Sequence, residues 1–597
     1  MKLRIALLFA LCAACARGGE GEATLPATVG ELVRTTLEAP VPAEIKGEEE
    51  RRHVWADMRR FYRKRLWHPA WFDASGALPA TQSLLDAIPV VAREGIEPAH
   101  YRREELAAYL AALQDPATFE DPQVQRRLVA ADLRFTYAFM TLAHHLAVGR
   151  FKPGSIKAEW YTKPRDPNLG ELLTAMIEKP EALGSGLEAL APPHESYGRL
   201  RTALRTYRDI AAAGGWPVVP PGPTLKKGAT GERVAALRER LDASGDLADG
   251  TAAAPSAEGE ENEAGAEPRG WLAKRRARAE AKAEAKAEAK AAAEAAAAAA
   301  QAPPAVYDEA LEAAVRRFQV RHGLEETGTV GKDTLAALNV PVAERVRQIE
   351  LNLERWRWMP GDLGENHIFV NVPAYGLRVV EGKETTLAMK VIVGKDQSRT
   401  PAFSDQMTYL ELNPWWNIPP SIERDEIMPK VAADPGYLAR NDMEMVSDGG
   451  DSRIRQRPGP ANPLGQIKFM FPNQFNIYLH DTPADHLFDV AERGFSHGCI
   501  RIEKPLELAE YLLRGDPKWN RAAIQAAIDT GENRSIKLPR PIPVHILYWT
   551  AWMEPDGMVQ FRDDLYGHDA ELAKALAEEP PVDLDLRGLE EAMQASR

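Results

Sequence analysis

The period of the apolar residues changes near Asn366, and this change divides the chain into a helical part and a strand-rich part. Before it, apolar side chains such as Leu133, Tyr137 and Met140 recur at the three- and four-residue intervals of a helix. After it, short segments such as 368–372 alternate apolar and other residues, as strands do. Because 597 residues are too many for one core, the sequence predicts a multi-domain α+β protein whose mainly β domain lies late in the chain.

One cysteine lies outside the N-terminal leader, and it falls in this strand-rich part. Around Cys499, the alternation places the thiol and Arg501 on the polar face of a strand. In the segment that ends at His480, the same alternation places Tyr478 and His480 on the face opposite the apolar residues, off the core. Two neighbouring strands would then present a thiol and an imidazole to one cleft.

A thiol beside an imidazole suits acyl transfer. The attacking species is the thiolate, and a histidine within hydrogen-bond reach lowers the thiol pKa and later returns the proton to the leaving amine. Gly498 lets the backbone approach a substrate closely, and the N–H groups of His497, Gly498 and Cys499 are candidate donors to an oxyanion. Two other interpretations stay open: a buried structural cysteine, and a zinc site made of His480, His497 and Cys499, although no HExxH motif is present.

The segment 480–501 resembles the signature of the L,D-transpeptidases with the YkuD-type catalytic domain. That signature is a histidine, a short spacer, then Ser or Thr followed by His-Gly-Cys, a hydrophobic residue and usually Asn. This chain has His480, then the run 496–500 with the sequence Ser-His-Gly-Cys-Ile, and Arg501 at the Asn position, as in a large multi-domain branch of the family. The order also differs from that of the NlpC/P60-like cysteine peptidases, in which the cysteine comes first.

The resemblance implies a reaction and a set of roles. Cys499 would attack the bond between the diamino acid and D-Ala in a tetrapeptide stem of peptidoglycan, expel D-Ala, and pass the acyl group to an amine of a second stem, giving a 3-3 cross-link. His480 would act as base and then as acid, while Ser496, His497 and Gly498 would shape the thiol and oxyanion site. Carbapenem-type β-lactams would acylate the same thiol, and neither a cofactor nor a metal is implied.

Further residues are candidates for binding the substrate. Tyr478 shares the polar face with His480, and Trp415 and Trp416 end a predicted strand, where their indoles would line the cleft, although a core or hinge role for one of them stays open. Arg501 would orient a substrate carboxylate or hold its strand by an ion pair. A peptidase that releases the same acyl-enzyme to water, and a wall-binding scaffold without activity, remain alternative functions.

The N-terminus and the charge limit where the protein acts. Lys2 and Arg4 precede a short apolar run and the small-residue pattern 14–16, which predicts a signal peptide and export to the periplasm or cell envelope. Cys15 as a lipidated N-terminus is the alternative. The net charge of -13 and the lack of a basic patch argue against nucleic acid as a partner. No later apolar run is long enough to cross a membrane, so we expect no transmembrane span in the mature chain.

Composition and period divide the chain further. The segment 250–304 is rich in Ala, Glu and Lys and predicts a solvated helix or a partly disordered spur inserted into a small helical module that resembles a peptidoglycan-binding domain. The expected parts are a signal peptide (1–16), a polar linker (17–50), a helical scaffold (51–220), a three-helix peptidoglycan-binding-like module (221–340, with the insertion 250–304), an L,D-transpeptidase domain (341–550, with a capping insertion 421–470) and a C-terminal tail (551–597).

Overall fold

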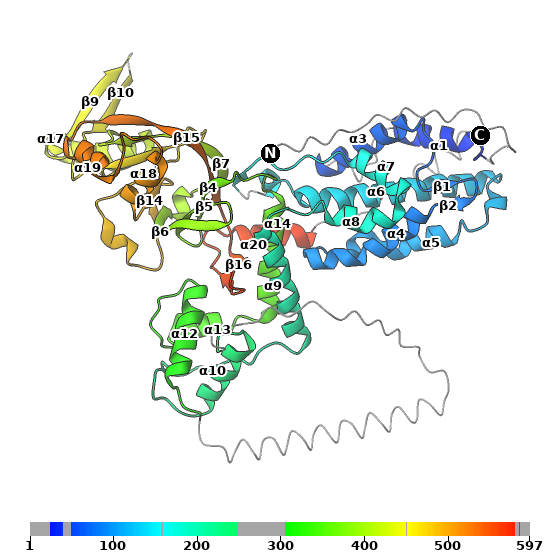
Figure 1. Ribbon diagram of the computed structural model, residues 1–597, viewed down its shortest axis with the longest axis horizontal. Coiled ribbons are helices and arrows are strands. Elements are labelled where there is room, and N and C mark those ends of the chain that lie inside the picture. Colours follow the sequence, from blue (N-terminus) through cyan, green and yellow to red (C-terminus); the bar gives the residue numbers. More distant parts are fainter. Residues whose placement is uncertain are drawn as a thin grey trace.

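The computed structural model describes residues 24–39, 49–156, 159–247, 305–448, 451–578 and Leu584. A helical scaffold lies at one end of the molecule and a mainly β domain at the other, with a small helical module beside the junction (Figure 1). This arrangement confirms the multi-domain α+β architecture. The predicted signal peptide and the insertion 250–304 lie outside the described residues.

The scaffold is built around one long helix, α6. Every side chain from Leu128 to Ala143 in α6 is buried, as expected for a helix that is largely apolar on all sides. Its N-terminus is fixed by Asp121, whose side chain accepts the N–H of Gln123 at 2.7 Å. The scaffold helices are α1 (Ala27–Glu38), α3 (Glu49–Lys64), α4 (Pro79–Ala87), α5 (Arg103–Ala111), α6 (Pro122–Val148), α7 (Leu169–Glu178), α8 (Leu183–Glu188) and α9 (Glu195–Ala212).

Helix α1 corrects the prediction of a polar linker over 17–50. Val29, Val33 and Leu37 recur at helix spacing and are fully buried in the scaffold core, where α1 packs on α6. The many charged residues that follow α1 hid this apolar stripe in the sequence. The scaffold therefore begins before residue 51.

The small module has the three helices that the sequence predicts: α10 (Glu232–Ala243), α12 (Glu309–Arg321) and α13 (Lys332–Leu338). Phe318 lies in its core, and a buried ion pair joins Arg321 to Asp246, with Nε 2.5 Å from Oδ1. Arg321 also donates to the carbonyl of Val559 at 3.2 Å, and Arg562 donates to the carbonyl of Arg321 at 2.8 Å. The module is thereby fastened to the C-terminal part of the chain.

The catalytic-domain candidate is a sheet that closes on itself. Within the described residues the strand order is β11-β12-β14-β6-β5-β4-β15-β7-β3, and β11 also pairs with β7, which completes a ring. Apolar side chains of the strands fill its interior, and α18 (Pro505–Leu513) and α19 (Arg521–Asp529) add to the same core. The strands are β4 (Asn366–Asn371), β5 (Gly376–Glu381), β6 (Glu384–Gly394), β7 (Ala402–Leu412), β11 (Ile467–Met470), β12 (Leu479–His480), β13 (Gly494–Ser496), β14 (Ile500–Ile502) and β15 (Arg534–Leu547).

The scaffold and the sheet are joined by shared secondary structure. The short strand β3 (Trp160–Tyr161) belongs to the scaffold segment and pairs with β7, with Trp160 opposite Ala402. Helix α14 (Val342–Arg357) packs on α9 and on the C-terminal helix α20 (His568–Glu578). Gly149, at the end of α6, has a φ of +94°, and a Cβ there would lie 2.6 Å from Glu354 of α14, so only glycine allows this close approach.

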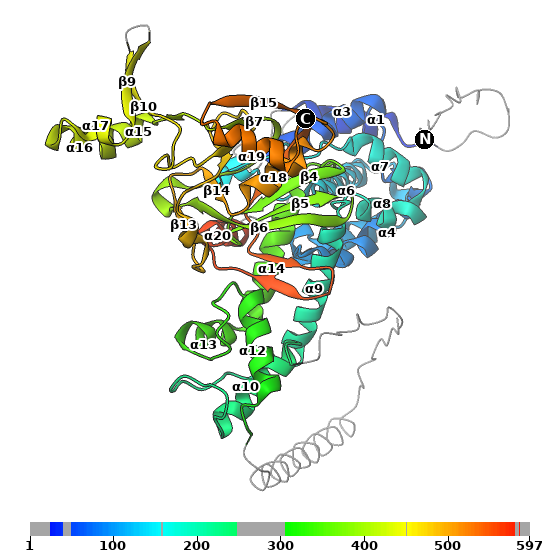
Figure 2. The ribbon, with the colours of Figure 1, turned by 60° about the vertical axis from the view of Figure 1, so that its left-hand side comes forward.

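An insertion between β7 and β11 forms a separate small unit, which we call the cap (residues 416–456). It has its own core of Ile418, Ile422, Ile427 and Ile454, and it projects from the closed sheet (Figure 2). Its elements are β8 (Trp416–Asn417), α15 (Pro420–Ile422), a π-helical turn (Glu423–Ile427), α16 (Met428–Ala433), α17 (Tyr437–Arg440), β9 (Met443–Asp448) and β10 (Asp451–Gln456). The predicted end of this insertion at residue 470 is wrong, because β11 with its buried Ile467 and Phe469 belongs to the closed sheet.

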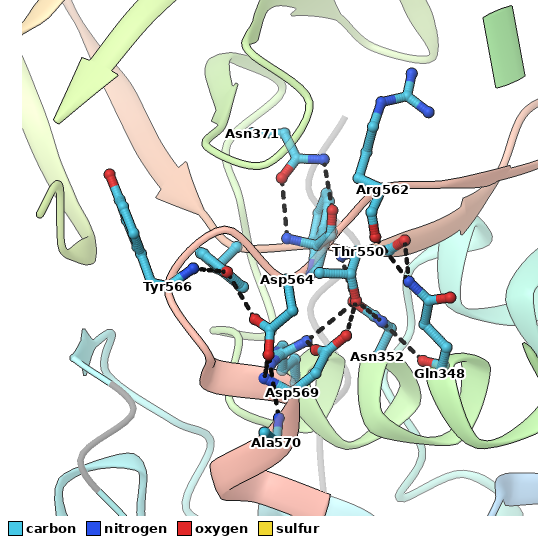
Figure 3. A network of polar contacts seen from close by, with 12 residues as sticks. Gln348, Asn352, Asn371, Thr550, Arg562, Asp564, Tyr566, Asp569 and Ala570 are labelled. Atoms are coloured by element: carbon cyan, nitrogen blue, oxygen red, sulfur yellow. Dashed lines mark hydrogen bonds and ion pairs between the residues drawn. The ribbon is translucent and has the colours of Figure 1, made fainter. Parts of the chain in front are cut away.

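The segment after residue 550 is not a tail over 551–578. The strands β16 (Ala551–Met553) and β17 (Val559–Phe561) and the helix α20 pack against α14, and a network of polar contacts joins them to it (Figure 3). In this network Thr550 donates to Asp569 at 2.7 Å, Asn352 donates to Thr550 at 2.8 Å, and Arg355 forms an ion pair with Asp569. Since these contacts span distant segments, sequence periodicity gave no sign of them.

The buried ion pair in this network supplies a test. Arg355 is only 2% exposed, so Asp569→Ala would leave a buried guanidinium without its carboxylate and should lower the free energy of unfolding by about 3–5 kcal/mol. Urea unfolding can be followed by tryptophan fluorescence, because Trp356 and Trp549 stack at 4.3 Å beside the network. Glu571→Ala, at an exposed position of the same helix, is the control and should leave the midpoint unchanged. Equal midpoints for the two variants would contradict a structural role for the pair.

Candidate active site

The predicted imidazole lies on strand β12, and the predicted thiol lies directly before the neighbouring strand β14. Strands β12 and β14 run parallel, with Leu479 opposite Ile500 and His480 opposite Arg501. Leu479 and Ile500 are fully buried in the core, so His480 and Arg501 share the other face, and Cys499 lies directly before β14. The register brings these residues together in the way that the alternation predicts.

The strand before His480 is much shorter than predicted. Only Leu479 and His480 pair as β12, because Asn476 has a φ of +54° and turns the chain. The side chain of Asn473 holds this turn: its Nδ2 donates to the carbonyl of Ile477 at 2.7 Å, and its Oδ1 accepts the N–H of Phe475 at 3.0 Å. The alternation in this stretch is therefore that of a hydrogen-bonded loop.

The surroundings of His480 define its chemical state. Its Nδ1 lies 2.6 Å from the carbonyl oxygen of Asp481, and since a carbonyl only accepts, Nδ1 carries the proton and Nε2 keeps a lone pair. The side chain is 4% exposed, so the expectation that it lies off the core is wrong with respect to burial, although it is right about the face. Burial, and then the charges of Arg501 and Lys468, lower the pKa of His480 to about 3. The ring is a neutral imidazole.

Cys499 is half-buried and protonated at neutral pH. Its Sγ lies 3.8 Å from the carbonyl oxygen of Asn476, within reach of a weak S–H hydrogen bond. Burial raises the pKa of Cys499, while hydrogen bonds from Tyr478 and the charges of Lys468 and Arg501 act in the opposite direction. The resting site thus pairs a thiol with a neutral imidazole.

Lys468 is a site residue that the sequence analysis missed. It lies opposite His480 on β11, is 12% exposed, and places Nζ 4.1 Å from the ring centre of Tyr478 and 3.9 Å from Glu411. Burial lowers the pKa of Lys468. Within the described residues the Nε of Arg501 is buried without a hydrogen-bond partner. Two cationic side chains therefore border the thiol, and the alternation of Ile467 to Met470 was the signal that could have revealed Lys468.

The turn before Cys499 is held by its own hydrogen bonds. The hydroxyl of Ser496 donates to the carbonyl of Cys499 at 2.5 Å and accepts the N–H of Gly498 at 3.0 Å. The N–H of Gly498 is thus already bonded, which corrects its assignment as an oxyanion donor and leaves the N–H groups of His497 and Cys499 as candidates. Gly498 has a φ of +111°, a conformation that favours glycine.

Residues far along the chain support this turn. Thr400 donates to the carbonyl of Gly498 at 2.7 Å. The hydroxyl of Tyr566 donates to the carbonyl of Gly394 at 2.6 Å and accepts the N–H of Thr400 at 3.2 Å. Neither Thr400 nor Tyr566 lies in a sequence motif, so nothing in the sequence indicates that they support the site.

The cap reaches the site through a contact between Glu426 and His497. Nε2 of His497 lies 2.7 Å from Oε1 of Glu426, which belongs to the cap. Trp416 packs with the cap core and pairs with β10, and the ring centre of Trp415 lies 4.0 Å from the guanidinium carbon of Arg455. The two tryptophans lie at the base of the cap, which fits the hinge or core role that the sequence left open.

The geometry gives no support to the zinc interpretation. His497 is directed to Glu426, and His480 Nδ1 to a carbonyl. Across the part of the chain that the structure describes, no three His, Cys, Asp or Glu side chains are grouped so that they could hold a metal ion. In the same residues, no helix is long and apolar enough to cross a membrane.

Fold and site together define a multi-domain protein in which a helical scaffold carries a closed β sheet with a cysteine–histidine site. Residues 365–519 match the YkuD family, described as an L,D-transpeptidase catalytic domain, while residues 56–204 match a scaffold domain and residues 297–338 a peptidoglycan-binding domain. Three separate segments of the chain are thus similar to a scaffold domain, a peptidoglycan-binding domain and a YkuD catalytic domain.

One curated relative is similar to part of the chain. A protein of Haemophilus influenzae strain Rd, whose name assigns it to the L,D-transpeptidases, is 31% identical over 243 residues, which cover 38% of this chain and 49% of that protein. The chain thus spans about half the length of this curated relative.

Two solved structures show weaker likenesses. The Ldtfm-avibactam carbamoyl enzyme is 9% identical, with 35% of this chain and 64% of that chain covered and a TM-score of 0.15. The L,D-transpeptidase of Xylanimonas cellulosilytica DSM 15894 is 15% identical, with 55% and 100% covered and a TM-score of 0.15. Likenesses at this TM-score carry no argument about the site.

The cationic side chains supply a test of the site. Lys468→Met removes one charge that favours the thiolate, so the pKa of Cys499 should rise further and its alkylation by iodoacetamide at pH 8 should slow by about threefold to tenfold, the effect of a half to one pKa unit. In both proteins the rate should still increase above pH 8, since the thiol pKa is raised. Lys504→Met, an exposed position just after β14, is the control. An unchanged rate in Lys468→Met would show that this charge does not act on the thiol.

Proposed function

We propose that the protein is an L,D-transpeptidase that forms 3-3 cross-links between peptidoglycan stems through an acyl-enzyme on Cys499. The observation that carries the proposal is the state of His480, whose Nδ1–H is bound to the Asp481 carbonyl so that Nε2 can accept a proton beside the thiol. The YkuD match over residues 365–519 and the peptidoglycan-binding match support the choice of substrate. A role in the periplasm or cell envelope follows from that substrate.

In the first half of the reaction, Nε2 of His480 takes the proton of the Cys499 thiol while Sγ attacks the carbonyl between the diamino acid and D-Ala. The oxyanion that forms accepts hydrogen bonds from the N–H groups of His497 and Cys499. The C–N bond then breaks, and the imidazolium gives its proton to the departing amine of D-Ala. In the second half, His480 accepts a proton from the attacking amine of the acceptor stem, and Sγ leaves as the new amide forms.

The paired cations fit a substrate that carries a carboxylate. The charges of Lys468 and Arg501 disfavour a positive charge on His480, so they make the first proton transfer unfavourable. A carboxylate of the stem bound between the two cations would offset their charge and raise the basicity of His480 at the moment when the base is needed. We assign Arg501 to this carboxylate, because no ion pair of Arg501 is present within the described residues.

The reaction is tested with purified protein and a disaccharide tetrapeptide. Mass spectrometry should detect a cross-linked dimer and released D-Ala, and Cys499→Ala should make neither. A carbapenem should add once per molecule to the mature wild-type chain and not to Cys499→Ala, because Cys499 is the only cysteine after Cys15. Tripeptide monomer as the sole product would identify a peptidase, and unchanged substrate would identify a scaffold without activity.

The cap supplies a second test of the transfer reaction. Because Glu426 contacts His497 beside the thiol, we propose that the cap limits the access of water to the acyl-enzyme and so favours transfer over hydrolysis. Gln456 lies opposite Trp416 in the cap sheet, so a short Gly-Ser link can replace residues 418–455 without straining the closed sheet. The replacement should raise the ratio of tripeptide monomer to dimer several-fold.

Two controls accompany the cap replacement. Alkylation of Cys499 by iodoacetamide should remain, since both strands of the site lie outside the replaced segment. Glu426→Gln should shift the product ratio in the same direction. Glu444→Gln, whose side chain pairs with Arg455 of the cap and with Arg457 directly after it, should not. A wild-type product ratio in the folded, shortened protein would mean that the cap does not exclude water.

A further inference from the structure

A cavity of about 480 Å³ lies at the seam where the scaffold strand β3 joins β7, and we call it the seam pocket. Its walls come from three separate segments of the chain: Tyr161 of β3, Phe403 and Asp405 of β7, and Asn473, Gln474 and Phe475 of the loop before His480. The volume is in the range of small-molecule sites. None of these residues takes part in the chemistry at Cys499.

One wall of the seam pocket is aromatic. The ring of Phe475 lies 4.7 Å from that of Tyr161 and 5.0 Å from that of Phe403, centre to centre. Tyr161 is 49% exposed, so much of its surface is open to a ligand. An exposed aromatic side chain on a fixed strand offers a flat apolar surface with a polar rim.

The polar wall of the seam pocket disfavours ligands that carry a negative charge. Its lining includes the carboxylate of Asp405 and the amide of Gln474, and no Lys, Arg or His. Asp405 accepts the N–H of Gln406 at 2.8 Å and has no ion-pair partner within the described residues. An anionic ligand would therefore find no counter-charge, whereas hydroxyl groups could donate to the carboxylate and both donate to and accept from the amide.

The seam pocket is preformed and close to the thiol. The amide of Asn473 is bonded to the backbone of its own loop, which fixes the position of Phe475. The next residue, Asn476, holds its carbonyl oxygen 3.8 Å from Sγ of Cys499. Since consecutive Cα atoms are about 3.8 Å apart, the loop that lines the seam pocket reaches the thiol within one residue, a separation that a disaccharide with its stem peptide is long enough to span.

We propose that the seam pocket binds a sugar ring of the glycan strand that carries the reacting stem. This inference rests on the proposed function, because it assigns the sugar to the same substrate. The apolar face of the ring would lie against Tyr161, and its hydroxyl groups would bond to Asp405 and Gln474. Binding of a part that does not react would help to position the stem, so a donor without sugars should lose turnover as well as affinity.

Two donors test this proposal, a disaccharide tetrapeptide and the free tetrapeptide. Wild-type protein should use the disaccharide form with a kcat/KM at least tenfold higher. Tyr161→Ala and Gln474→Ala should bring the two donors close to equality and leave turnover of the free tetrapeptide unchanged. Gln406→Ala, exposed on β7 and outside the pocket lining, should keep the wild-type preference. Equal use of both donors by the wild type would overturn the proposal.

A binding measurement separates failure of this proposal from failure of the proposed function. Saturation-transfer NMR of Cys499→Ala with N,N′-diacetylchitobiose, a neutral acetylated disaccharide, should show binding that is lost when Tyr161→Ala is added. This result would hold even if the protein turned over neither donor, in which case only the proposed reaction would fail. Absence of binding, or equal binding with and without Tyr161, would contradict a sugar site.

Discussion

The closed hydrogen-bond ring of the sheet is the constraint on which the site depends. Strand β7 pairs with β15 along one edge and with β11 along the other, and Leu412 takes part in both pairings. Closure fixes β11 beside β12, and β12 in turn lies beside β14. Residues that are paired across these strands therefore have their side chains on the same face of the sheet. Lys468, His480 and Arg501 lie across three successive strands for this reason. A slip of one residue in any of these strands would turn a polar side chain of the site into the core.

The electrostatics of the site follow from that arrangement. A neutral base beside two cations and a thiol with a raised pKa form a pair that is poorly reactive in the absence of a ligand. A protonated thiol is less prone to oxidation, because oxidation requires the thiolate. The same burial that lowers the pKa of His480 also makes its hydrogen bond to Asp481 stronger, so the orientation of the base is retained while its basicity is low.

Sequence patterns predicted the elements that depend on residues close together in the chain. Alternation identified β4 and β15, helical period identified the scaffold and the small module, and the run from Ser496 to Cys499 identified the candidate nucleophile. The errors share a cause, which is that tertiary contacts decided the outcome. A charged neighbourhood hid α1, two asparagine residues turned a predicted strand into a loop, and α20 is held by side chains from α14. The alternation of residues 467–470 could place Lys468 on the polar face of a strand, but its position opposite His480 depends on a strand register that no single segment encodes.

The pairing of β3 with β7 has a consequence for how the molecule can be divided. Domain boundaries usually fall where few contacts cross, but here the scaffold supplies backbone hydrogen bonds to the sheet at Ala402 and Phe403. A fragment that begins after the scaffold would leave this stretch of β7 as an open strand edge next to the apolar Phe403 and Phe475. Open edges of this kind pair with other chains. The scaffold therefore covers an edge that would otherwise be open to pairing with other chains, and the strand that covers it lies about 240 residues earlier in the sequence.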